Sequence, residues 1–470
     1  MNIKKILTSK NANTLAFFNV LGPIILNGIN FFTVPIFTRL LGTNNYGIVS
    51  IYTTWVQVFS IIMGLQTGGT IAVSKTYFKK EEQRAYYSSI LSLSCLSSAI
   101  ITLAIAIFIK PVSAFMQMDI VIIFIMLLQS FGTYVVSFAT LKFTYEKEAP
   151  KNFAMSLVVA LVTTVLSIVL IPLMSYEERY VGRIVGYAVP NILAGIVITI
   201  LFFKRGRKFY SASYWRFCLP LCLPLIFHNL SQIILGQSDR IMLQKLLLDN
   251  GSVGIYSFIF TFTHLLSVIW GALNNTWVPF YYDYMREKDV TQIKAKSKNY
   301  VFLFTILCMG FMLLSPEAVR IFASKEFWKG TYLIPIMTIS CYMVFLYSFP
   351  VNFEFYYKQT PLIAIGTCCA AGLNIILNLV MIPKLGILGA AVATTTAYIF
   401  LFVFHQLIAR YIVKNDYHYT FMFFLPGSLA VVGVAVVFYI TLEMWYIRWG
   451  IACLLGIILL MRIYKQRSIF

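Results

Sequence analysis

The chain has 470 residues, of which 59% are hydrophobic and only 11% are charged. This composition excludes an ordinary soluble protein, because nearly the whole length is apolar and leaves no room for a sizeable soluble domain. The formal net charge of +20 could suggest a nucleic-acid partner, but no basic and aromatic module stands outside the apolar segments. We therefore expect an integral membrane protein that binds no nucleic acid.

Apolar stretches long enough to cross roughly 30 Å of hydrocarbon as α-helices follow one another along the chain. The fourteen predicted spans are 14–36, 46–68, 88–109, 119–140, 153–174, 181–203, 218–241, 253–277, 299–317, 331–352, 362–383, 387–409, 420–441 and 446–462. The last is short, so twelve spans and a loosely defined final pair is the alternative count. The expected fold class is an all-α integral membrane protein with about fourteen transmembrane helices.

Basic residues are unevenly distributed among the loops between these spans. One loop contains Lys204, Arg205, Arg207, Lys208 and Arg216. With a cytoplasmic N-terminus, most of the 37 Lys and Arg residues lie inside, as the positive-inside rule requires. An even number of spans returns the C-terminus to the same side, so we predict a multi-pass protein with both termini in the cytoplasm. The basic stretch 281–298 is interpreted as an amphipathic helix on the membrane surface or as a solvated connector.

The first and seventh spans repeat one another. At a constant offset of 201, Pro23 aligns with Pro224 and Arg39 aligns with Arg240. Further matches follow in the same order at slowly growing offsets, as loop insertions in a duplicated chain would produce. Six spans in each half give both halves the same orientation, so the pseudo-two-fold axis of this parallel repeat is expected along the membrane normal.

The repeat predicts two six-helix lobes around a central cleft, followed by two appended helices. The expected parts are an N-terminal lobe at 1–204, a cytoplasmic basic linker at 205–216, a C-terminal lobe at 217–410, and transmembrane helices 13 and 14 with a cytoplasmic tail at 411–470. Two homologous membrane halves that face one another are typical of a transporter with its binding site between them.

Polar side chains form a stripe on each of the two repeated spans. Asn27 and Asn30 share one face of the first span, and Asn229 and Gln232 share one face of the seventh. Polar groups are costly inside the bilayer and usually face a cavity or another helix. We predict that these four residues line the cleft and bind substrate, with helix–helix hydrogen bonding as the alternative.

Charged and titratable residues near these stripes are further candidates. Arg39 and Arg240 lie near the outer ends of the two spans, where a guanidinium offers several donors to a phosphate or carboxylate. The alternatives are a snorkelling anchor for each arginine, or an Arg240–Asp239 pair that closes a helix end. Asp239 and His228 are the candidates for coupling transport to protons or sodium, and Glu354 is expected at the cytoplasmic rim.

The sequence contains no recognisable catalytic motif. GxSxG, HExxH, Walker and paired-carboxylate patterns are all missing from it. The eight cysteines lie in or beside apolar spans without metal-ligand spacing. We therefore expect a protein that is not an enzyme, with no catalytic residues, no metal site and no cofactor other than a possible coupling proton or sodium ion.

Several short motifs suggest a family. Residues 31–42, FFTVPIFTRLLG, followed by Tyr46-Gly47, resemble the opening of Wzx-type polysaccharide flippases, and so do SDR at 238–240 and IPKLG at 382–386. The resemblance runs from about residue 12 to 410. It implies membership of the multidrug/oligosaccharidyl-lipid/polysaccharide exporter superfamily, which includes multidrug extruders and lipid II flippases. The positions that match the family are Arg39, Asp239 and Arg240.

This resemblance implies an activity, partners and a location. The substrate is expected to be an undecaprenyl-pyrophosphate-linked oligosaccharide, the repeat unit of an O-antigen, capsule or exopolysaccharide. Alternating access would move it from the inner to the outer leaflet of the bacterial cytoplasmic membrane. A polysaccharide polymerase and chain-length machinery are the expected protein partners.

Two other functions compete with this interpretation. A multidrug or small-molecule extruder would share the fold but needs acidic groups deep in the cleft, where Asp239 is nearly alone. A membrane polysaccharide polymerase would need a larger external loop that carries catalytic groups, and the predicted loops are short.

Overall fold

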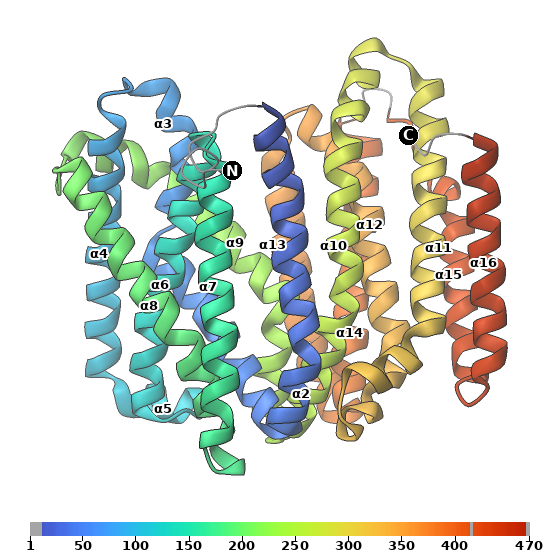
Figure 1. Cartoon of the computed structure of the whole chain (residues 1–470). Coiled ribbons are helices and arrows are strands. Elements are labelled where there is room, and N and C mark those ends of the chain that lie inside the picture. The colour runs from blue at the N-terminus through green and yellow to red at the C-terminus, as the bar shows by residue number, and fades with distance from the viewer. Residues whose placement is uncertain (1–11, 414–416, 467–470) are drawn as a thin grey trace. The chain divides into compact units, whose positions relative to one another are not determined.

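The computed structural model describes residues 12–413 and 417–466, and these residues form helices without any strand (Figure 1). The α-helices are α2 (Ala12–Gly64), α3 (Ile71–Tyr77), α4 (Gln83–Ile107), α5 (Ile109–Met116), α6 (Ile120–Tyr145), α7 (Ala149–Leu170), α8 (Arg179–Gly206), α9 (Ala212–Leu247), α10 (Asn250–Glu287), α11 (Val290–Phe322), α12 (Ile334–Tyr356), α13 (Thr360–Leu385), α14 (Ile387–Leu407), α15 (Phe421–Ile440) and α16 (Trp445–Gln466). Helical turns Thr67–Thr70, Ile171–Leu173, Tyr176–Glu178, Lys325–Leu333 and Ile408–Val413 join or extend them. The all-α fold class is confirmed.

Thirteen helices among the described residues are long and apolar enough to cross a membrane. The first of them, α2, consists of two helices that meet at Gly42, so the expected count of about fourteen is confirmed. The termini that we predicted to be cytoplasmic, residues 1–11 and 467–470, lie outside the described residues.

The break in α2 depends on a glycine and on side chains that bind the freed backbone. Gly42 has φ 67° and ψ 178°, a conformation that L-residues rarely adopt because of their Cβ atom. The carbonyl of Leu41 accepts a hydrogen bond from Asn45 Nδ2 at 3.0 Å, and the carbonyl of Leu40 accepts one from Arg179 Nη1 at 2.9 Å. These contacts satisfy carbonyl groups that the break removes from the helix.

The chain divides into two compact units, residues 1–233 and 234–470. The limits of the four predicted parts stay predictions. In the first unit, α6 and α8 cross closely at Gly132 and Gly195, where a Cβ on Gly195 would lie 2.6 Å from the Cα of Gly132. Small residues allow membrane helices such a close approach, and van der Waals packing then holds them together.

The second unit has an aromatic core and contains the last two helices. Trp277, Tyr300, Phe304 and Phe345 are buried together in it. Helices α15 and α16 both pack against α11 (Figure 1). Arg448 of α16 is buried and binds Glu317 of α11, with 2.5 Å between Nη2 and Oε1.

The prediction of an amphipathic helix on the membrane surface at 281–298 is wrong, whereas the alternative of a solvated connector stays a prediction. Helix α10 continues to Glu287, and α11 starts at Val290 after a two-residue turn. Asp289 ends the turn by accepting a hydrogen bond from the backbone nitrogen of Gln292 at 2.9 Å, as an N-cap residue does. The apolar face of the segment, with Tyr281 and Ile293, is buried in the protein core rather than in lipid.

Candidate functional site

The side chain of Asp239 on α9 lies in the interior of the second unit, and only 1% of the residue is exposed. Its Oδ1 accepts a hydrogen bond from Asn378 Nδ2 of α13 at 2.6 Å. Its Oδ2 accepts one from Thr394 Oγ1 of α14 at 2.6 Å and another from the hydroxyl of Tyr256 of α10. A buried carboxylate is costly without such donors, so three neighbouring helices stabilise this one.

A second layer of polar groups surrounds this carboxylate. Asn374 donates from Nδ2 to Thr394 Oγ1 at 3.0 Å and accepts at Oδ1 from Asn378 Nδ2 at 3.1 Å. Ser238 Oγ also donates to Asn374 Oδ1, at 3.2 Å. The Oδ1 atom of Asn378 is buried and has no hydrogen-bond partner among the described residues. Carboxylate, amide and hydroxyl oxygens are ligands of hard cations, so this cluster has the chemistry of a site for a proton or a small hard cation.

Arg240, the next residue on α9, is held by contacts within the same unit. Its Nε donates to Ser257 Oγ at 3.2 Å, and its Nη1 donates to Gln237 Oε1 at 2.8 Å. The guanidinium carbon lies 4.7 Å from the centroid of the Phe260 ring, within the range of a cation–π interaction. The residue is 7% exposed, so its orientation is fixed by packing as well as by hydrogen bonds.

The remaining predicted site residues belong to the first unit. Asn27 and Arg39 lie on α2 with exposed side chains, and the side chain of Asn30 is outside the described part of the structure. On α9, Gln232 is exposed while His228 and Asn229 are half-buried. The structure thus brings Asp239 and Arg240 together in one unit, and the shared cleft stays a prediction.

The two ion-coupling candidates do not form one cluster. His228 precedes Asp239 on α9 by about three helical turns, and it belongs to the part of α9 that clusters with the first unit. The partners of Asp239 come instead from α10, α13 and α14.

A buried Glu–His pair is a functional candidate that the sequence reasoning missed. Glu354 of α12 was expected at the cytoplasmic rim, yet it is fully buried. His405 Nδ1 of α14 lies 2.9 Å from each of its carboxylate oxygens, and His405 is also fully buried. Both residues stand near the ends of apolar helices, where sequence alone does not separate a residue at the rim from a buried one. The available signal was that both titratable groups lie at the cytoplasmic ends of two predicted spans.

The fold is that of a multi-pass membrane protein. Among solved structures, the inward closed conformation of the lipid II flippase MurJ matches with a TM-score of 0.72 at 16% identity, over 97% of this chain and 99% of that chain. An inward-facing multidrug resistance MATE family transporter of the MOP superfamily matches with a TM-score of 0.51 at 16% identity, over 87% and 94% of the two chains. At these identities the likeness shows the fold alone.

The family follows from the sequence comparison. The model of the polysaccharide biosynthesis protein family matches residues 15–285, more than half of the chain, and the chain belongs to this family. A membrane protein of Haemophilus influenzae is 24% identical over 389 residues, 79% of this chain and 92% of that protein. The probable low-salt glycan biosynthesis flippase Agl15 of Haloferax volcanii is 20% identical over 413 residues, 84% of this chain and 82% of that one. The resemblance to polysaccharide flippases is thereby confirmed.

Proposed function

We propose that this protein moves lipid-linked oligosaccharides from the inner to the outer leaflet of the bacterial cytoplasmic membrane. The observation that carries the proposal is the family match over residues 15–285, and the likeness in fold to a lipid II flippase supports it. A sugar-bearing pyrophosphate cannot cross hydrocarbon unaided, because burying its charges and hydroxyls unpaired would cost many kcal/mol. A hydrated path lined by amide and guanidinium donors would replace the water that the headgroup loses.

The substrate that we infer is an undecaprenyl-pyrophosphate-linked repeat unit, carried by alternating access. Arg39 and Arg240 would bind its phosphates, and Asn27, Asn30, Asn229 and Gln232 would bind its sugars. We further infer that both termini are cytoplasmic, from the basic loops, and that a polysaccharide polymerase and chain-length machinery receive the product.

The energy source that we propose is a proton or sodium gradient sensed at Asp239. This residue places an ionisable carboxyl group in a buried polar cluster, in which the oxygen Asn378 Oδ1 has no partner among the described residues. A cation that neutralises the carboxylate would change the hydrogen bonds of α10, α13 and α14 together. His228 is the second candidate for this role.

The decisive experiment measures lipid-linked sugars in a strain that lacks the protein and has no redundant flippase. Accumulation of the undecaprenyl-pyrophosphate oligosaccharide on the inner leaflet, with loss of the surface polymer, is the expected result. Complementation with Arg39→Ala and Arg240→Ala copies tests the two arginines. Normal intermediates together with normal surface polymer would contradict the proposal and favour export of small molecules.

A further inference from the structure

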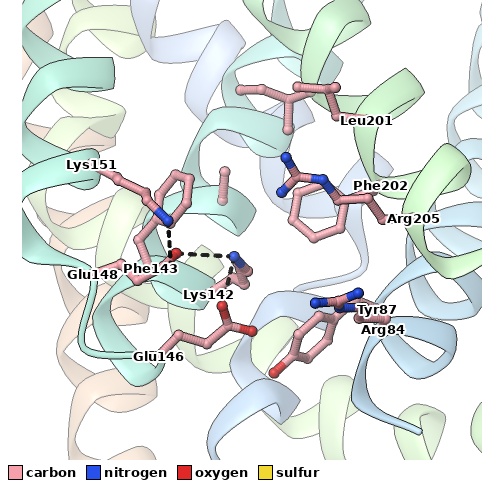
Figure 2. Close-up of a pocket in the computed structure, with 12 residues that line it drawn as sticks. Arg84, Tyr87, Lys142, Phe143, Glu146, Glu148, Lys151, Leu201, Phe202 and Arg205 are labelled. Carbon is pink, nitrogen blue, oxygen red and sulfur yellow. Dashed lines mark hydrogen bonds and ion pairs between the residues drawn. The ribbon is translucent and has the colours of Figure 1, made fainter. Parts of the chain in front are cut away.

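One end of the first unit contains a cavity of about 320 Å³ that the proposed transport path does not use (Figure 2). Helices α4 and α7 begin at this end, and α6 and α8 terminate there, so the cavity lies at one membrane face. The predicted topology makes this the cytoplasmic face. Its volume is at the lower limit of the range of about 300–1,000 Å³ that is usual for small-ligand sites.

Two lysines and two glutamates on one wall of the cavity neutralise each other. Lys142 Nζ lies 2.6 Å from Glu146 Oε2 and 3.3 Å from Glu148 Oε2, and Lys151 Nζ lies 2.5 Å from Glu148 Oε1 (Figure 2). Partial burial alone would raise the pKa of Glu148, but the hydrogen bonds and positive charges of Lys151 and Lys142 outweigh it and hold this pKa below its ordinary value. The four side chains therefore form a closed set of ion pairs.

Two arginines on the opposite wall leave the cavity with a net positive charge. Arg84 of α4 and Arg205 of α8 both line it, and their guanidinium groups have no hydrogen bond or ion pair with a described residue. Tyr87, beside Arg84, also lines the cavity, but its hydroxyl is buried away from the open space. The two guanidinium groups are therefore the groups that an anionic ligand in the cavity would meet.

The rest of the lining is apolar and continues onto an exposed apolar side of α8. Phe202 and Leu201 contribute to the wall, and Leu201 is 44% exposed on a helix long enough to span the bilayer. A ligand in this cavity would therefore meet two unpaired cations at one end and a hydrocarbon surface at the other. That combination fits an amphiphile with an anionic head.

We propose that this cavity binds the phosphate group of an anionic membrane lipid through Arg84 and Arg205. Planar guanidinium groups bind phosphate oxygens in pairs and keep their charge at all physiological pH values. Basic pockets between transmembrane helices at the cytoplasmic side are suited to such headgroups. The acyl chains would lie along Leu201 and Phe202. The test measures lipid binding and not transport. A negative result would therefore contradict the proposed lipid site without contradicting the proposed flippase activity, and the reverse also holds.

The test uses the purified full-length chain with phosphatidylglycerol titrated into it and bound lipid counted by native mass spectrometry. Arg84→Gln with Arg205→Gln is expected to weaken the tightest binding event by about tenfold or more, as loss of charge-assisted hydrogen bonds does. The matched control, Lys80→Gln with Lys204→Gln, removes the same charge from exposed positions outside the cavity and is expected to bind like wild type. Equal weakening in both double variants would reduce the effect to general charge attraction and overturn the proposal.

A further arm makes the result unambiguous. Glycerol 1-phosphate replaces the lipid in a parallel titration. If it binds as tightly as phosphatidylglycerol and depends equally on Arg84 and Arg205, the ligand is a soluble phosphate and the lipid assignment is overturned. If the double arginine variant does not fold, Arg84→Gln and Arg205→Gln are tested singly, each beside its lysine control, and unchanged binding in both would overturn the proposal.

Discussion

The carboxylate of Asp239 on α9 accepts a hydrogen bond from the side-chain amide of Asn378 on α13, with 2.6 Å between Oδ1 and Nδ2. The same amide also donates to Asn374 Oδ1, so one asparagine connects the acid to the next polar layer. A cation bound at Asp239 would compete with this donor for the same oxygen. The arrangement thus links the charge state of Asp239 to the packing of α9 against α13.

Replacing Asp239 with Asn is expected to remove the response of the protein to its coupling ion. A ligand that binds only the folded state raises its stability by an amount that grows with the logarithm of the ligand concentration. The melting temperature of wild type should therefore rise with the concentration of sodium or protons, while that of Asp239→Asn should not. The corresponding coupling free energy is typically about 1–3 kcal/mol. The control is Asp283→Asn, which removes an exposed acid from α10. Retention of the full ion response in Asp239→Asn would exclude this residue as the coupling site.

Arg240 and Arg39 are expected to differ in their effect on stability although the repeat pairs them. Arg240→Ala breaks two side-chain hydrogen bonds and the contact with Phe260, which should destabilise the protein by about 1–3 kcal/mol. Arg39 is exposed, so Arg39→Ala should change the stability by no more than about 0.5 kcal/mol. Thermal unfolding of the purified variants measures the difference. Equal losses of stability would show that Arg39 is also held by packing.

The break in α2 is expected to depend on Gly42. A Cβ at φ 67° is strained, so Gly42→Ala should cost about 1–3 kcal/mol. Gly28 on the same helix serves as the control, because a Cβ there would meet nothing within 4 Å and Ala is the better helix former. Gly28→Ala should leave the melting temperature unchanged or raise it. A tolerated Gly42→Ala would mean that Asn45 and Arg179 alone hold the break.

The positions of the membrane-spanning helices could be predicted from the sequence, because each one needs only a sufficiently long run of apolar residues. The polar contacts between these helices could not be predicted. The prediction of fourteen spans needed only runs of hydrophobic residues. The burial of Glu354 depends on its contact with His405 across fifty-one positions, and no local pattern reveals such a contact. The stretch 281–298 was misinterpreted for a related reason, because amphipathic periodicity is the same whether the apolar face meets lipid or Trp277 and its neighbours.

The candidate site could be predicted only in part. Asp239 and Arg240 were chosen because charges inside a span are costly, and the structure gives both of them defined partners. The partners themselves, Asn378 and Thr394, lie on other helices and carry no motif that links them to the seventh span. Which residues of distant helices come into contact is determined by how the helices pack, and a single sequence contains no information about that packing.

The ion pairs of Glu148 are expected to make stability depend on pH below the ordinary pKa of this residue. Its pKa is lowered from 4.5 in the folded protein, so the folded state favours the ionised form. The resulting stabilisation is fully present above pH 4.5 and is lost as the pH falls through the lower folded value. Glu148→Gln should cost about 0.2–1 kcal/mol at pH 7, and its melting temperature should converge with that of wild type in acid. A constant difference at all pH values would assign the loss to packing.

The buried pair of Glu354 and His405 is expected to show strong coupling in a double-mutant cycle. His405→Ala leaves a fully buried carboxylate without its partner, which typically costs about 3–5 kcal/mol. Glu354→Gln in the His405→Ala background removes that uncompensated acid, so the double variant should be more stable than His405→Ala alone. Thermal unfolding of wild type, both single variants and the double variant gives the interaction energy. Simple addition of the two single losses would mean that the 2.9 Å contact contributes nothing beyond the volume of its two side chains.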